Sequence, residues 1–201
     1  MSGALLGGVL AGYGVAVPVG AIAVLIAGLS ARISWRVGAA AGLGAATADG
    51  VYALLAVLGG AALAGVVAPI GTPLRWVAAL VLLGLAGRTA WVALHGRSAT
   101  DAQPRPPATA GKAYAGILGL TLLNPATLVY FAALVLGRGG AGGGAWFVVG
   151  AFLASASWQL LIAASGALAG RLLTGPRAQL ITALVSSGVI AVLALLLLLK
   201  R

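Results

Sequence analysis

The chain has 201 residues, of which 62% are hydrophobic and only 7% are charged. Because roughly a quarter of the residues in a soluble domain are charged, this composition excludes a soluble globular protein and predicts an integral membrane protein. The net charge is +10, but the twelve Lys and Arg residues are spread along the chain, mostly in the loops, without interleaved aromatic residues. That distribution is typical of membrane topology rather than of nucleic-acid binding. With no cysteine, the chain forms neither disulfides nor thiolate metal sites.

Polar and Gly/Pro-rich breaks divide the chain into six apolar segments, each long enough to cross a bilayer as a helix of about 20 residues. The first, residues 3–29, is too long and lacks the basic leader of a secretory signal. The second is expected to end before PIGTP, where Pro69 and Pro73 stop helices. Period-two alternation is missing throughout, which argues against a β-barrel. The six predicted transmembrane helices cover residues 3–29, 37–67, 74–94, 113–136, 145–169 and 178–199.

The loop charges and the helix count predict the topology. Loops one, three and five carry seven Lys and Arg residues, whereas loops two and four carry only Arg75 and Arg138. The odd loops are therefore predicted to be cytoplasmic, with both termini outside. Three helices in residues 1–94, a polar linker in 95–112 and three helices in 113–201 are typical of two inverted repeats. Aligning GLGAATADG with GAFLASASW supports the repeat and pairs Asp49 with Ser157.

Asp49 is an acid within a long apolar run, and the chain has only one other acidic residue. It lies 13 residues past Arg36, which is about 20 Å along a helix at 1.5 Å per residue and therefore near the middle of the bilayer. An acid there costs roughly 2.5 to 3.5 kcal/mol on insertion scales, so it is expected to face a cavity or the bundle interior. Asp49 is thus a candidate for binding substrate or carrying a proton. The alternative is a structural acid bonded to Arg88 or to a Thr hydroxyl.

Two prolines interrupt predicted helices at matching places in the two halves. Pro18 lies in VAVPVGA, next to Gly20, and Pro125 lies in LLNPATLVYF, next to Asn124. A proline inside a helix frees a backbone carbonyl, which water or a substrate can satisfy where the helix lines a cavity. Matched breaks of this kind predict a transporter binding site, to which Thr127 adds a further polar group. Either proline alone is equally well explained as a packing kink.

Further polar residues near the same depth are secondary candidates for the site. Tyr52 and Gln159 are also well explained as hydrogen-bonding core residues. Arg88 either extends to the cytoplasmic headgroups or faces inward as a charge partner for Asp49 or a substrate carboxylate. The secondary set is Thr47, Tyr52, Arg88, Ser157 and Gln159.

The sequence offers no catalytic constellation. The single histidine, His95, lies in a predicted loop, and no nucleophile motif or phosphate-binding loop is present. One histidine and two separated aspartates do not make a metal cage. The sequence therefore predicts neither an enzyme nor a bound metal or cofactor.

Two stretches resemble the lysine exporter (LysE/RhtB-type) amino-acid efflux family. PVGAIAVLIAGLSARISWRVGAAAGLGAATADG resembles its first motif, with Pro18, Gly20 and the helix-two acid Asp49 in place. NPATLVYF resembles its second motif through Asn124 and Pro125. The chain departs from the usual Pro-Gly-Pro core, which reads Pro-Val-Gly here, and it lacks the Lys that often follows Asn-Pro. Both departures touch the substrate site.

The resemblance implies a secondary transporter in the cytoplasmic membrane of a bacterium. It would export an amino acid or a related small metabolite, driven by the proton gradient or the membrane potential. Its partners would be that substrate and the lipid bilayer, without nucleic acid, and a homo-oligomer stays open. The alternatives are a membrane scaffold or assembly protein that does not transport and, less favoured because ligands are few, a metal-cation exporter.

Overall fold

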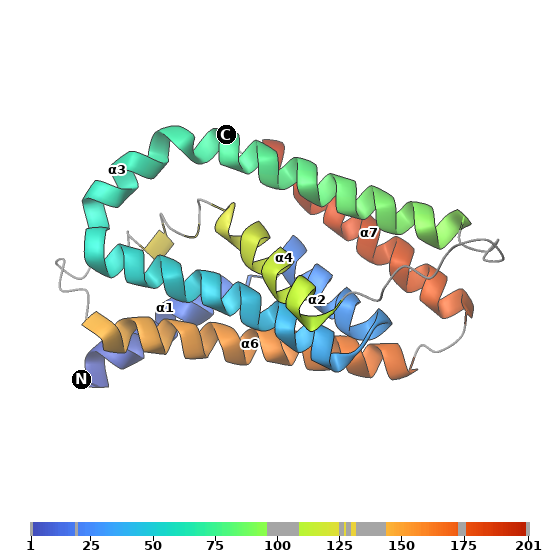
Figure 1. Ribbon diagram of the computed structural model, residues 1–201, viewed down its shortest axis with the longest axis horizontal. Coiled ribbons are helices and arrows are strands. Elements are labelled where there is room, and N and C mark those ends of the chain that lie inside the picture. The colour runs from blue at the N-terminus through green and yellow to red at the C-terminus, as the bar shows by residue number, and fades with distance from the viewer. Residues whose placement is uncertain are drawn as a thin grey trace.

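The computed structural model describes residues 2–18, 20–95, 109–124, 127, 130–131, 144–172 and 176–199. This part of the chain is helical and contains no strand, in agreement with the predicted all-α class. Figure 1 shows α6 and the first part of α3 side by side, with the short helices α2 and α4 near the middle. The helices are α1 (Ser2–Ala16), α2 (Ala21–Arg32), α3 (Trp35–His95), α4 (Ala110–Leu122), α6 (Gly144–Leu172) and α7 (Pro176–Leu199).

The first predicted helix is two helices, α1 and α2, whose axes differ in direction by 80°. The chain leaves the helix after Ala16, forms a bend through Pro18 and is extended at Gly20, where φ is −114° and ψ is −173°. Proline explains the break, because its ring excludes the preceding turn of a continuous helix. The two helices pack in succession along α6. Together they form one broken span.

The predicted helix ends at Pro69 and Pro73 are wrong, because α3 is assigned as helical from Trp35 to His95. A straight helix of 61 residues would be about 90 Å long at 1.5 Å per residue. Both arms of α3 nevertheless pack against one buried cluster, because Ala45 of the first arm and Leu82 of the second belong to it. The chain therefore reverses within α3, as Figure 1 shows, and proline is among the recognised causes of sharp bends in helices.

Two helices in the described part of the chain, Trp35–Gly59 and Gly144–Arg171, are long and apolar enough to cross a membrane. The broken pair α1–α2 would be a third, so the structure supports part of the six-span prediction. Large apolar side chains cover the outside of these elements: Leu58, for example, is 75% exposed and Leu10 62%. So much exposed apolar surface would be unstable in water and fits a lipid environment.

Glycines allow the closest helix contacts in the bundle. A Cβ atom on Gly8 or Gly12 of α1 would collide with the backbone of α6, and one on Gly166 of α6 would collide with the backbone of α2. Likewise, Gly44 of α3 lies directly against the backbone of α4. Small residues at a spacing of four, such as Gly8/Gly12 and Gly166/Gly170, let membrane helices approach this closely.

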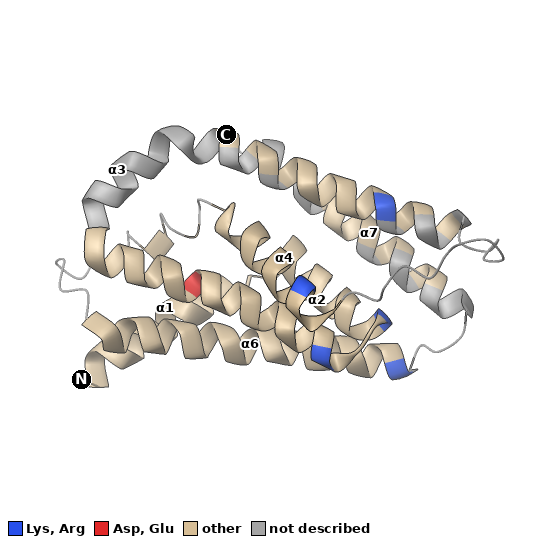
Figure 2. Cartoon of the chain, in the orientation of Figure 1, with Lys and Arg blue, Asp and Glu red and all other residues tan. Residues whose placement is uncertain are grey.

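The basic residues whose side chains the structure describes lie toward one end of the bundle (Figure 2). They belong to the end of α2, the start of α3, the later part of α3, the start of α4 and the end of α6. In the sequence these segments flank or precede loops one, three and five. Their common location is what the positive-inside rule expects of one membrane face. The residues are Arg32, Arg36, Arg88, Lys112 and Arg171.

Two buried apolar clusters form the core. The first, which includes Ile26, Leu82 and Ile117, joins α2, both parts of α3 and α4. The second includes Phe131 and Phe147, whose rings meet edge to face with their centroids 6.4 Å apart. Ala45 belongs to the first cluster and Tyr52 to the second, so Asp49, between them on α3, lies at the junction.

Candidate functional site

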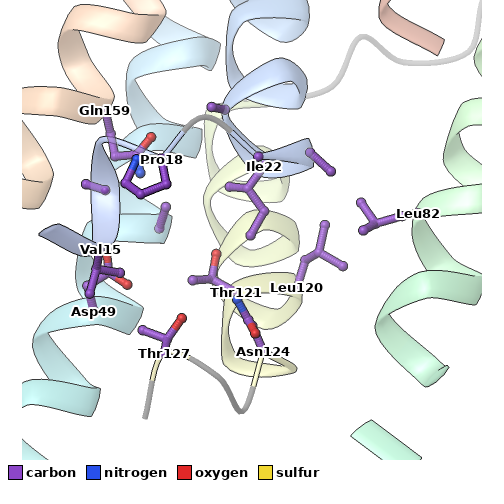
Figure 3. A pocket seen from close by; sticks show the side chains of 15 residues that line it. Val15, Pro18, Ile22, Asp49, Leu82, Leu120, Thr121, Asn124, Thr127 and Gln159 are labelled. Carbon is purple, nitrogen blue, oxygen red and sulfur yellow. The ribbon is translucent and has the colours of Figure 1, made fainter. Parts of the chain in front are cut away.

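Both helix breaks open onto one cavity of about 250 Å³ beside Asp49. Figure 3 shows Pro18 and Ile22 on one side of it, Asn124 and Thr127 on another, and Asp49 beside Val15. Its volume corresponds to about eight water molecules at roughly 30 Å³ each, which is the scale of one small metabolite. The lining residues are Val15, Ala16, Pro18, Gly20, Ala21, Ile22, Ala23, Ala45, Asp49, Leu82, Leu120, Thr121, Asn124, Thr127 and Gln159.

The first break presents the beginning of α2 to the cavity. Gly20 is the N-cap residue and, having no side chain, provides no capping hydrogen bond. The first backbone bond in the helix runs from the N–H of Val24 to the carbonyl of Gly20, at 3.2 Å. The N–H groups of the first turn therefore lack intrahelical acceptors, as at any helix start, and they carry the positive end of the helix dipole.

The second break presents the end of α4. The helix stops at Leu122, and Asn124 is non-helical, its N–H donating to the carbonyl of Thr121 at 3.0 Å. The hydroxyl of Tyr52 donates to the carbonyl of Leu122 at 2.6 Å and so satisfies an acceptor at this helix end. A turn bond of 3.3 Å from the N–H of Thr127 to the carbonyl of Asn124 follows. Pro125 lies outside the described residues.

Asp49 is buried, at 3% exposure, and receives a 2.6 Å hydrogen bond from the hydroxyl of Ser155 on α6. Within the described part of the chain, no basic side chain pairs with its carboxylate. Arg88, offered from the sequence as one such partner, is exposed and does not line the cavity. Asp49 thus brings a carboxyl group to the cavity with a neutral hydroxyl, rather than a cation, as its neighbour.

Gln159 is the other buried polar residue on this wall. It is 6% exposed, lines the cavity and has a side-chain oxygen, Oε1, without a hydrogen-bond partner. It lies one helical turn after Ser155, so both side chains are on the same face of α6. Figure 3 shows its amide directed toward Pro18, at the break between α1 and α2.

The other secondary candidates do not line the cavity. Thr47 bonds the hydroxyl of Tyr114 at 3.0 Å and the carbonyl of Leu43 at 2.8 Å, so it joins α3 to α4. Ser157, predicted opposite Asp49, instead lies 2.8 Å from the hydroxyl of Tyr13 on α1. Tyr52 supports the end of α4 from outside the cavity. These side chains hold the surrounding helices together.

Sequence reasoning missed Ser155, although it belongs to the same ASAS stretch, residues 154–157, as Ser157. The helices α3 and α6 run antiparallel, and their register places Ser155, two residues before the aligned position, against Asp49. The apolar part of the lining, including Ile22, Leu82 and Leu120, gave no signal, because such residues fill every segment of this chain.

A helical, lipid-compatible bundle with two interrupted helices around a small cavity defines a multi-pass membrane transport protein. Comparison with protein families agrees. The chain matches the family of LysE type translocators over residues 14–201 and therefore belongs to it. Neither the curated proteins nor the solved structures include a match.

Proposed function

We propose that this translocator exports an amino acid or a related small metabolite across the bacterial cytoplasmic membrane, driven by the proton gradient or the membrane potential. One observation carries the proposal: the two helix breaks and the only acid in an apolar segment line a single cavity. Helix breaks concentrate unsatisfied backbone groups where a polar substrate must be held within the bilayer. Membership in the translocator family supports the same conclusion.

Asp49 is assigned the central chemical role. As a carboxylate it binds the ammonium group of the substrate, and as a neutral acid it carries a proton in the opposite direction. Ser155, its hydrogen-bond partner among the described residues, accommodates both states, because a hydroxyl can donate or accept a hydrogen bond. An arginine partner would have held the group permanently charged.

We propose further that residues 1–94 and 113–201 form inverted halves that move against each other, with 95–112 as their linker. The packing is reciprocal: α1 of the first half lies along α6 of the second, and α4 of the second lies along α3 of the first. Both pairs run parallel. In the first pair Gly8 meets Phe147 and Gly12 meets Ala151, and in the second Gly44 meets Tyr114 and Tyr52 bonds Leu122, so residue numbers rise together along each pair. A twofold axis in the membrane plane would produce this exchange.

The experiment is an efflux assay in a bacterium that lacks its own amino-acid exporters. Cells expressing wild type, Asp49→Asn or Ser157→Ala at matched membrane levels are loaded with dipeptides, and released amino acids are followed by mass spectrometry. Ser157→Ala is the control, since it removes a hydroxyl at similar depth outside the cavity. Wild type and Ser157→Ala should release a selected amino acid and Asp49→Asn should not. Equal release from Asp49→Asn would refute the role of Asp49, and no release from any variant would favour another cargo or a scaffold.

A further inference from the structure

The cavity has chemically different walls. On the α3–α6 wall, Asp49 and the unpartnered Oε1 of Gln159 are hydrogen-bond acceptors. On the α2 wall, the backbone N–H groups of the uncapped first turn are donors, and the helix dipole adds positive potential. Between them the surface is apolar, with Ile22 and Leu82 among its residues.

We infer that the start of α2 binds the carboxylate of the substrate, that Asp49 and Gln159 Oε1 bind its ammonium group, and that the cavity therefore selects a neutral α-amino acid. The inference rests on the proposed export function and names the substrate class of the same site. An ammonium group brings three N–H donors, enough to serve both the carboxylate and the amide oxygen. The terminal torsion of a glutamine is soft, so Oε1 can turn toward the ligand while α6 stays in place.

The charges that line the cavity disfavour amino acids with a basic or an acidic side chain. A basic side chain would bring a second cation, but in the part of the chain that the structure describes Asp49 is the only acidic residue that lines the cavity. An acidic side chain would bring a second anion to a cavity that no Lys or Arg lines among the described residues. An unpaired charge within the bilayer costs several kcal/mol, so both are disfavoured. The volume of about 250 Å³ and the apolar lining fit a small or medium-sized uncharged side chain.

Gly20 allows the carboxylate subsite to be tested in place. A Cβ atom there meets nothing within 4 Å, and its φ of −114° is open to any residue. Aspartate is among the best N-cap residues because its side chain accepts from the N–H groups of the first turn. Gly20→Asp therefore places a carboxylate where that of the substrate would bind, whereas Gly20→Ala adds a side chain without an acceptor.

The test is counterflow in proteoliposomes containing wild type, Gly20→Ala, Gly20→Asp or Gln159→Leu. The probes are radiolabelled alanine, threonine, leucine, lysine and glutamate, and unlabelled lysine, glutamate and the methyl ester of leucine serve as competitors against the neutral probes. Wild type should exchange at least one neutral amino acid, none of the three competitors should inhibit appreciably, and Gly20→Ala should lose less exchange than Gly20→Asp. Gly20→Asp should reduce exchange at least tenfold, and Gln159→Leu should raise KM about tenfold, the effect of losing one hydrogen bond to a charged group.

The outcomes separate the two proposals. Exchange of lysine or glutamate in place of neutral amino acids, or full activity in Gly20→Asp, would overturn the assigned subsites and leave amino-acid export standing. Inhibition by the methyl ester as strong as that by leucine would overturn the carboxylate contact alone. Absence of exchange with every probe, by wild-type protein that is folded and monodisperse, would contradict the export of amino acids itself.

Discussion

The contact between α1 and α6 supports the cavity, and it can be weakened at two glycines. A Cβ atom at Gly8 would overlap the carbonyl of Phe147, and one at Gly12 would lie 2.9 Å from both the Cα of Ala151 and the Cβ of Ala154. The obstacle at Gly8 is backbone, which cannot turn aside as a side chain can, so the helices must separate. Overpacking of this kind costs about 1 to 3 kcal/mol.

The double variant Gly8→Ala/Gly12→Ala should therefore be less stable than wild type. Using about 2 to 4 °C per kcal/mol for a chain of this size, we expect the midpoint of thermal unfolding to fall by roughly 2 to 12 °C. The assay is the monodisperse fraction of purified protein that survives heating, measured by size-exclusion chromatography. Transport should fall as well, because α1 carries Val15 and Ala16 of the cavity wall.

Gly84→Ala is the matched control. Gly84 is also helical, on α3, but a Cβ atom there meets nothing within 4 Å. Alanine favours a helix by up to about 1 kcal/mol over glycine, so this variant should match or exceed the stability of wild type. If the α1 double variant proved as stable as Gly84→Ala, the close packing of α1 on α6 would be refuted.

Two other side chains give contrasting predictions. Tyr52→Phe removes the donor to the carbonyl of Leu122 and should lower stability by about 1 kcal/mol in the same heating assay. It should also reduce transport, because the end of α4 would be displaced. Unchanged stability and transport would show that Tyr52 does not support the second helix break. Arg88→Gln alters an exposed residue away from the cavity and should leave the KM of transport within about twofold of wild type. A tenfold rise in KM would instead restore Arg88 as a substrate or Asp49 partner.

Much of the site follows from residues that are unusual in an apolar chain. Pro18, Asn124 and Asp49 are individually conspicuous, and the structure places all three on the lining of one cavity. Their cost within a bilayer makes such residues informative, because a lipid-facing position would not tolerate them. Gln159 was a secondary candidate for the same reason.

The misplacements have physical causes. We expected a helix to end before Pro69 and Pro73, yet a helix can bend at proline and continue. Prolines in an apolar chain therefore indicate where the chain changes direction better than where a helix ends. Arg88 was considered a partner of Asp49, but sequence depth does not say which face of α3 a side chain occupies. The register between α3 and α6 was beyond sequence alone, since glycines and alanines fit at many offsets; for that reason Ser155 was missed.

Accessibility at Ala45 tests most directly whether the cavity is the substrate site. The chain has no cysteine, so Ala45→Cys, one turn before Asp49 on the cavity wall, would be the only thiol. Ala53→Cys is the control, because Ala53 is equally buried on α3 but belongs to the second core cluster and does not line the cavity. A small water-soluble thiol reagent should modify Ala45→Cys faster than Ala53→Cys, and a mixture of the amino acids other than cysteine should slow only the former. Equal rates at the two positions, or no protection at Ala45→Cys, would contradict a substrate site between the two helix breaks.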